Sequence, residues 1–243
     1  MSKEEFTRED LDIFLKELGK EFRKRNGRKT PAEMILVGGA SVLINYGFRE
    51  MTTDIDAVIQ ASSAMKEAIA AVGDRFGLPG DWLNTDFTKT TSFSRYLVQY
   101  SRHYKTYGNI LEIRTVCAEY LLAMKLVSGR KYKKDMSDII GIIMEERKRG
   151  NEITYEQVDR AMQDLYGGWD RVDEQALRLL KQALVTENLD ELFDEQQEEE
   201  KANKQILIEF REKYPQQIKG LNINDVIQKA KEKEAEHERK GTL

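Results

Sequence analysis

Hydrophobic positions divide the chain into an alternating first half and a helical second half. Apolar residues recur at helical spacing over residues 7–25, and this run ends at Asn26-Gly27. The stretch MILVGG is typical of a short buried strand, ASVLINYG of a helix, TDIDAVIQ of a strand and SSAMKEAIAAVGDRFG of a second helix. The alternation of strand and helix predicts an α/β layer structure.

Residues 78–116 give weaker signals. Residues 78–91 are rich in turn-forming residues, and SRYLVQYS fits either a strand or a helix. GNILEIRTV (108–116) is a better strand, because it is rich in β-branched residues and begins at Gly108. We expect this segment to add a strand to the sheet.

From Ala118 onward the apolar spacing is almost wholly helical. The predicted helices span residues 118–128, 135–149, 154–166 and 173–186. The fold class is therefore α/β (α+β), with a mixed-sheet core followed by a helical region. We predict three parts: an α/β core (1–117), a helical domain that closes the cleft (118–186), and an acidic linker with C-terminal helices (187–243).

The last part of the chain carries narrow apolar stripes on a charged background. NKQILIEFREKYP and INDVIQKAKEKEAEHERKG each predict a helix that would be marginal without a surface to pack on. We expect these helices to dock on the body of the protein or to bind another subunit, as in a homo-oligomer.

The amino-acid composition limits which side chains an enzyme of this sequence could use for catalysis. The chain has 243 residues, 40% of them hydrophobic and 34% charged, without an apolar run long enough to span a membrane. The N-terminus lacks the apolar core of a secretory signal, so we expect a cytoplasmic protein without a membrane partner. One cysteine excludes an internal disulfide framework, and two histidines leave little for histidine-based sites. An enzyme of this composition would depend on carboxylates.

Charge is unevenly distributed along the chain. The formal net charge is −4, yet residues 22–30 and 125–134 are basic, whereas residues 187–201 are acidic. The basic stretches are candidate contacts for phosphate groups.

Two motifs in LVGGASVLINYGFREMTTDIDAVI suggest a nucleotide site. Asp54 and Asp56 alternate along a strand, so both carboxylates face one side, where two oxygen ligands suit Mg²⁺. Gly38 and Gly39 at a strand-to-helix turn allow close approach of a triphosphate, and the Ser41 hydroxyl adds a donor. Taken singly, each motif also fits a plain turn or a cap.

The same stretch resembles the signature of the DNA polymerase β-like nucleotidyltransferase superfamily. It is most similar to the minimal abortive-infection and toxin-type members, and Arg49, Thr53, Asp54 and Asp56 match their pattern. The resemblance implies an NTP substrate, Mg²⁺ or Mn²⁺, and transfer of an NMP to a hydroxyl of RNA, a protein or a small molecule. It also implies a toxin–antitoxin or phage-defence setting, with an antitoxin as a further candidate partner for the C-terminal helices.

The superfamily has a third acidic residue on a neighbouring strand, which binds the metal or activates the attacking hydroxyl. Glu112 is the best candidate for this residue, because it interrupts an apolar strand. An alternative is that Glu112 simply pairs with Arg114 or a lysine. Doubt over this residue keeps open an alternative function, a catalytically inactive nucleotide-binding or protein-interaction module with the same fold.

A second block, LLAMKLVSGRKYKKDMSDIIGI, resembles the segment of the abortive-infection relatives that supplies a lysine, an arginine and an aspartate. Lys125, Arg130 and Asp135 match these positions. We expect Lys125 and Arg130 to contact phosphate, although a helix lysine with its charge in solvent is a common alternative. Asp135 and Asp138 also fit a structural role at the start of the next helix.

Overall fold

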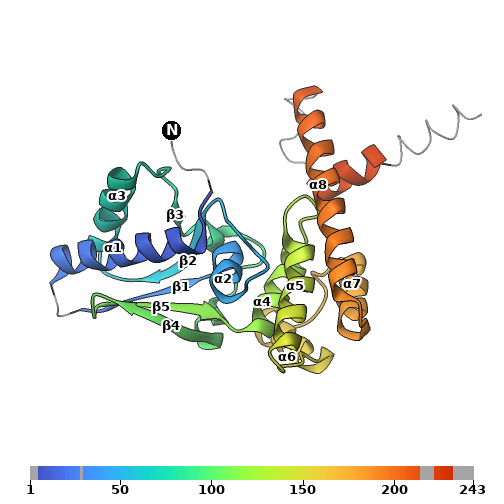
Figure 1. Ribbon diagram of the computed structural model, residues 1–243, viewed down its shortest axis with the longest axis horizontal. Helices are drawn as coiled ribbons and strands as arrows, with labels where there is room; N and C mark the ends of the chain where they lie inside the picture. The colour runs from blue at the N-terminus through green and yellow to red at the C-terminus, as the bar shows by residue number, and fades with distance from the viewer. Residues whose placement is uncertain (1–4, 28–29, 214–221, 232–243) are drawn as a thin grey trace, which may run out of the picture.

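A five-stranded mixed sheet forms the N-terminal half of the protein (Figure 1). The computed structural model describes residues 5–27, 30–213 and 222–231. The strands are β1 (Ala32–Leu36), β2 (Ile55–Gln60), β3 (Leu83–Asn84), β4 (Ser101–Tyr107) and β5 (Leu111–Val116), in the order β3-β2-β1-β5-β4. β1 runs antiparallel to β2 and parallel to β5. This mixed sheet confirms the predicted fold class.

One face of the sheet is covered by α1 (Arg8–Asn26) and α3 (Ala64–Phe76). α1 begins with a capping box in which Thr7 and Asp10 exchange hydrogen bonds, and Gly27 follows its last residue. The apolar stripe read from the sequence is the buried side of α1, and it packs with alternate residues of β1, β2 and β5. These contacts fix the strand that carries the aspartate pair.

The opposite face of the sheet shares its core with the helical half. Ile35 and Val37 from β1 and its end, and Val116 from β5, pack in one cluster with the helices that follow. A short helix, α2 (Gly38–Asn45), contributes to the clusters on both faces. Helices begin at Ala118, as predicted, but the hydrophobic core continues across that point. The domain boundaries therefore stay predictions.

The helical half begins with four helices that match the sequence pattern to within one residue at each end. They are α4 (Ala118–Ser128), α5 (Asp135–Lys148), α6 (Tyr155–Tyr166) and α7 (Glu174–Val185). Their periodic apolar positions are buried in the shared cluster. Strong periodicity over more than ten residues was enough to define these helices.

Two strands escaped the sequence analysis. β4 (Ser101–Tyr107) is an edge strand with exposed positions on both faces, so it has no apolar alternation to detect. β3 has two residues only. The segment SRYLVQYS forms a 3₁₀ helix, η2 (Arg95–Tyr100), which is followed directly by β4. A second 3₁₀ helix, η1 (Asp86–Lys89), follows β3.

The acidic run forms the first half of a long helix, α8 (Leu189–Lys213), which packs on α5 and stands beside the other helices (Figure 1). Residues 223–231 are also helical, whereas the remainder of the two predicted C-terminal helices lies outside the described residues. In the described part of the chain, no helix is both long enough and apolar enough to cross a membrane.

Glu200 of α8 caps the N-terminus of α5, which has no side-chain cap of its own. One carboxylate oxygen accepts the N–H groups of Met136 (2.9 Å) and Ser137 (3.0 Å), and the other accepts the Ser137 hydroxyl (2.6 Å). The side chain is buried. Burial raises the pKa of Glu200 to about 7, although the hydrogen bonds from Ser137 oppose this shift.

The raised pKa of Glu200 predicts a pH-dependent stability. Between the ordinary pKa of 4.5 and about 7, the folded protein retains a proton that the unfolded chain releases, so the free energy of unfolding falls as the pH rises. At 1.36 kcal/mol per pKa unit, the free energy of unfolding should therefore fall by about 2–3 kcal/mol less in Glu200→Gln than in the wild type. Urea unfolding at pH 5 and pH 7.5 measures this difference in stability, and Glu198→Gln, at an exposed position, is the control. Equal pH dependence in wild type and Glu200→Gln would contradict the assignment.

Candidate functional site

Asp56 lies in β2 and Asp54 directly before it, and the alternation along the chain places both on the face opposite to α1 and α3. Ile55 and Ala57 are fully buried on the opposite face, against α1 and α3. Within the described residues, no hydrogen bond or ion pair engages either carboxylate. Burial and the neighbouring Asp54 raise the pKa of Asp56 above its ordinary value. Two adjacent carboxylates that are not engaged in an ion pair make a suitable site for a divalent cation.

The glycine turn lies directly beside this pair. Gly38 opens α2 with a φ of +55°, and a Cβ at this position would stand 3.7 Å from Oδ2 of Asp56. The N-cap residue Val37 makes no side-chain capping bond, so the first turn of α2 keeps donors available for an anion. Ser41 differs from expectation. It is fully buried, with its hydroxyl oxygen 3.5 Å from Nδ2 of Asn45 inside the core, and does not face the site.

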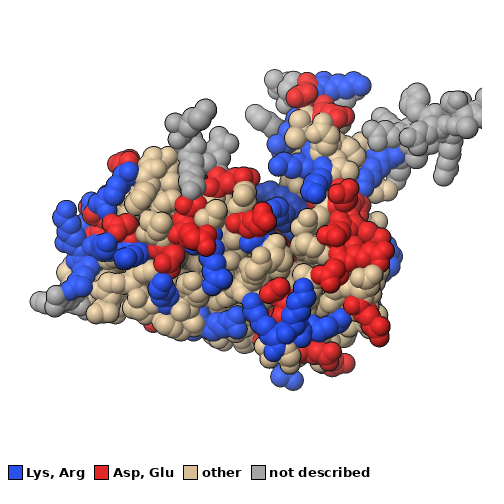
Figure 2. Space-filling model, in the orientation of Figure 1, with Lys and Arg blue, Asp and Glu red and all other residues tan. Residues whose placement is uncertain are grey.

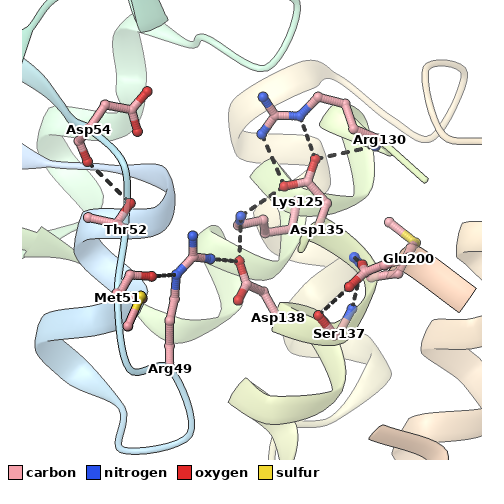
Figure 3. A network of polar contacts seen from close by, with 11 residues as sticks. Arg49, Met51, Thr52, Asp54, Lys125, Arg130, Asp135, Ser137, Asp138 and Glu200 are labelled. Carbon is pink, nitrogen blue, oxygen red and sulfur yellow. Dashed lines mark hydrogen bonds and ion pairs between the residues drawn. The ribbon is translucent and has the colours of Figure 1, made fainter. Parts of the chain in front are cut away.

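Gly39 makes room for Arg49. A Cβ at Gly39 would lie 2.7 Å from Nη2 of Arg49 and 2.8 Å from Oγ1 of Thr52. Thr52 in turn donates its hydroxyl hydrogen to the carbonyl of Asp54 (3.2 Å; Figure 3). The second glycine therefore lets the segment before β2 pack on the start of α2. Thr53, the expected nucleotide contact, is exposed.

This packing predicts a cost for Gly39→Ala. The added methyl displaces Arg49 or Thr52, and overpacking outweighs the better helix propensity of alanine, for a net loss of about 1–2 kcal/mol in the free energy of unfolding. Gly47→Ala is the matched control, because a Cβ there meets nothing within 4 Å. The midpoints of urea unfolding compare the two variants. A Gly39→Ala protein as stable as Gly47→Ala would contradict the close packing.

Arg49 belongs to a chain of charges, buried except at Arg130, that joins the two halves of the protein (Figure 3). Its Nη1 lies 2.5 Å from Oδ2 of Asp138, and the same oxygen lies 2.7 Å from Nζ of Lys125. Lys125 also donates to Asp135 (2.8 Å), and Asp135 accepts two bonds from the guanidinium of Arg130 (2.8 and 3.1 Å). Three cations and two anions thus alternate from the sheet lobe to the start of α5.

This chain changes the roles expected for its members. Lys125 is 4% exposed, and its ammonium is held by both aspartates instead of being directed at a nucleotide. Burial alone would lower the pKa of Lys125, but Asp135 and Asp138 outweigh it and raise the pKa. Despite its burial, Asp135 has a pKa well below its ordinary value, because Lys125 and Arg130 stabilise the carboxylate. These contacts favour the structural interpretation of Asp135 and Asp138.

The basic loop, residues 129–134 between α4 and α5, presents cations to the aspartate pair. Arg130 and Lys133 both act electrostatically on Asp56, and Asp54 also acts on Lys133. Partial burial and the charge of Arg130 lower the pKa of Lys133. Figure 3 shows Arg130 and Asp54 on opposite sides of the space between the lobes. Arg130 thus lies across from the aspartate pair, and its contact with phosphate stays a prediction. Lys133 was missed because nothing in the sequence distinguishes it from its basic neighbours.

Two further polar residues near Asp56 were missed. Asn84 on β3 is paired with Asp56 in register, so the two side chains share a face. Asp86 follows in η1, and its charge contributes to the raised pKa of Asp56. The motif WLNTD could have pointed to them only if β3 had been recognised as the neighbour of β2.

Glu112 does not join this group, which corrects the expectation of a third carboxylate from β5. It pairs in register with Glu33 of β1, which is paired with Gln60 at the far end of β2. That register sets Glu112 four residues from Asp56, or about 13 Å along the strand direction. Its carboxylate accepts a bond from Arg114 (2.9 Å), as in the alternative interpretation.

The metal-ligating capacity of the site is limited to the aspartate pair. Across residues 5–27, 30–213 and 222–231, no three His, Cys, Asp or Glu side chains are grouped to hold an ion. A site with two carboxylates fits Mg²⁺ when substrate phosphates complete its coordination. In Figure 2, blue surface lies in the recess between the lobes beside red surface of the sheet lobe, a charge arrangement suited to a phosphate–metal complex.

Comparison with known proteins places the chain in a family. The model of a family described as a nucleotidyltransferase of unknown function, DUF6036, matches residues 14–164. The matched region contains the sheet, the aspartate pair, the glycine turn and the basic loop, and leaves out α7 and α8. No curated protein and no solved structure matches the chain.

Proposed function

Because the chain belongs to the DUF6036 family of nucleotidyltransferases, we propose that it transfers an NMP from an NTP to a hydroxyl acceptor in a metal-dependent reaction. The observation that carries this proposal is the unpaired aspartate pair on β2, with the glycine turn beside it and the basic loop opposite. Each element has a separate task in such a reaction.

Asp54 and Asp56 would hold Mg²⁺ or Mn²⁺. The pKa of Asp56 is raised, so Arg130 and Lys133 compensate its charged form only in part, and a divalent cation would supply the rest. When bound, the ion neutralises triphosphate oxygens and polarises the phosphorus that is attacked. Glu112 takes no part in this site.

The first turn of α2 and the basic loop would bind the triphosphate. Backbone N–H groups at Gly38 and Gly39 approach phosphate oxygens without obstruction from a side chain, although Gly39 is also required for the packing of Arg49. Arg130 and Lys133 add positive charge from the other lobe. Arg130 keeps both of its bonds to Asp135, so its position is fixed, while Lys133 acts on Asp54 and Asp56 through its charge.

Transfer then follows from alignment of the bound groups. The oxygen of an acceptor hydroxyl forms a bond to the α-phosphorus, and the bond from that phosphorus to the bridging oxygen of the β-phosphate breaks. Pyrophosphate leaves, and the proton of the hydroxyl passes to water. The positive charge of the basic loop stabilises the charge that develops on the leaving group.

We propose RNA, a protein or a small molecule as acceptor, in a toxin–antitoxin or phage-defence setting. Support for this setting comes from the resemblance of residues 36–59 to toxin-type nucleotidyltransferases. Figure 2 shows a recess between the lobes that is open to solvent, which is compatible with a large acceptor.

A labelling experiment tests the proposal. The protein is incubated with each NTP labelled on the α-phosphate, Mg²⁺ or Mn²⁺, and cellular RNA or lysate. We expect label on an acceptor from at least one NTP, and none from the same NTP labelled on the γ-phosphate. Label from the γ-phosphate would indicate phosphoryl transfer and contradict the proposal.

A second candidate is a nucleotide-binding module without catalysis. The absence of a third acidic ligand among the described residues favours it, since the superfamily signature includes one. This alternative predicts metal-dependent binding of an NTP without label transfer to any acceptor. The labelling and binding experiments together separate the two functions.

A further inference from the structure

The C-terminal helices hold the basic loop through its backbone. Four of the six loop residues are Lys or Arg, so mutual repulsion would favour an open arrangement of the free loop. Its two ends are fixed by α4 and α5, but its middle has no secondary structure of its own beyond a turn. Asp135 accepts the N–H of Arg130 (3.3 Å), and further side-chain contacts to the backbone of the loop come from residues far along the chain.

Asn224, in the helical segment 223–231, binds the loop on both sides of Arg130. Its Nδ2 donates to the carbonyl of Gly129 (2.8 Å), and its Oδ1 accepts the N–H of Lys131 (3.2 Å). One amide side chain thus satisfies both backbone groups, which leaves the guanidinium of Arg130 directed at Asp135.

Asn203 of α8 completes the attachment. Its Nδ2 donates to the carbonyl of Lys131 (2.8 Å), and the side chain is 1% exposed. Both backbone groups of Lys131 are therefore bound by side chains from the C-terminal region. Glu200, one turn earlier on the same face of α8, binds the first turn of α5 just after the loop.

These bonds do not involve the cationic side chains of the loop, of which Arg130 is bound to Asp135 and Lys131 to Gln175. All three loop contacts of Asn203 and Asn224 are to backbone atoms, and neither residue neutralises Arg130 or Lys133. Moreover, Oδ1 of Asn203 is buried with no hydrogen-bond partner among the described residues, a penalty that an apolar side chain would avoid. Asn203 is thus better explained by its bond to the loop than by the packing of α8.

We propose that Asn203 and Asn224 are positioning residues for triphosphate binding, and that the C-terminal helices set the affinity of the site by holding the basic loop toward Asp54 and Asp56. This inference rests on the proposed function. Both residues lie outside the region matched by the family, so this control is an addition to the matched part of the chain.

Titration calorimetry with Mg²⁺ and inorganic tripolyphosphate tests the proposal without knowledge of the base. Asn224→Ala and Asn203→Leu should each weaken binding about fivefold to tenfold, the equivalent of one hydrogen bond of about 1 kcal/mol or slightly more. Gln205→Ala, an exposed residue of α8, is the control and should bind like the wild type. Asn203→Leu also removes the unsatisfied oxygen, so this variant should remain folded.

Calorimetry distinguishes a role of Asn203 and Asn224 in positioning the loop from a role in the stability of the fold. A purely structural role would lower the number of binding sites per chain but leave the dissociation constant of the folded molecules unchanged. Hydrogen exchange at Lys131 gives a second measurement, in which Asn224→Ala should speed exchange of that amide. Wild-type dissociation constants in both variants, or unchanged exchange, would overturn this inference alone. Failure of the wild type to bind tripolyphosphate would overturn the proposed function as well.

Discussion

Asp56→Asn is expected to reduce nucleotidyl transfer at least about 1,000-fold without loss of stability. Loss of a metal ligand removes several kcal/mol of transition-state stabilisation, and each 1.36 kcal/mol is a factor of ten in rate. Asp56→Asn should raise the free energy of unfolding, whereas most substitutions in a core strand lower it. Because burial and Asp54 raise the pKa of Asp56, the ionised carboxylate destabilises the folded protein at neutral pH, and a neutral amide relieves this.

The assay of α-phosphate transfer and a thermal unfolding curve at pH 7 measure the two effects on the same protein. Glu112→Gln is the matched control, since Glu112 lies on the same sheet but apart from the aspartate pair, and should keep transfer within about twofold of wild type. A lower melting temperature for Asp56→Asn would show that the carboxylate has a partner in the folded protein. Loss of transfer in Glu112→Gln would return Glu112 to the site.

The pH dependence of Asp56 follows from the same shift. Its pKa in the folded protein lies above the unfolded value of 3.8, so its contribution to stability is lost as the pH rises through the raised pKa. Bound metal would reverse this effect by stabilising the ionised pair. An increase in melting temperature with Mg²⁺ in the wild type, and not in Asp56→Asn, is therefore part of the same expectation.

The sequence predicted the local features of the site but not its long-range contacts. Alternation on one strand was enough to place Asp54 and Asp56 on a common face, and strong apolar periodicity defined the four helices from α4 to α7. Glu112 was misplaced because strand order alone does not give register, and its position depends on the pairing of β5 with β1. Lys125 was misinterpreted because its partners Asp135 and Asp138 come from the next helix.

The residues that bind the backbone of the basic loop were even less predictable from the sequence. Asn203 and Asn224 lie more than seventy residues along the chain from the backbone groups they bind. An asparagine in a charged helix gives no signal of this kind, because its role depends on how α8 packs against α5. Such contacts become visible only when the tertiary structure is known.

Asp135→Asn should cost about 3–5 kcal/mol in the free energy of unfolding, the second large effect that the structure predicts. Asp135 is 1% exposed and binds both Lys125 and Arg130. Removal of its charge leaves three cations with only Asp138, and an uncompensated buried charge is costly. The loop also loses the anchor for the Arg130 guanidinium, so tripolyphosphate binding should weaken together with stability.

Urea unfolding at pH 7 measures the cost, and Asp190→Asn is the control, because the ion pair of Asp190 with Lys148 (3.6 Å) is exposed. The lowered pKa of Asp135 gives a further signature. Its stabilising effect is present above the unfolded pKa of 3.8 and is lost as the pH falls toward the lower folded value, so wild type and Asp135→Asn should approach each other in stability in strong acid. Similar unfolding midpoints for Asp135→Asn and Asp190→Asn at pH 7 would show that Lys125 and Arg130 find other partners. In that case the charge chain between the lobes would not hold the basic loop in place.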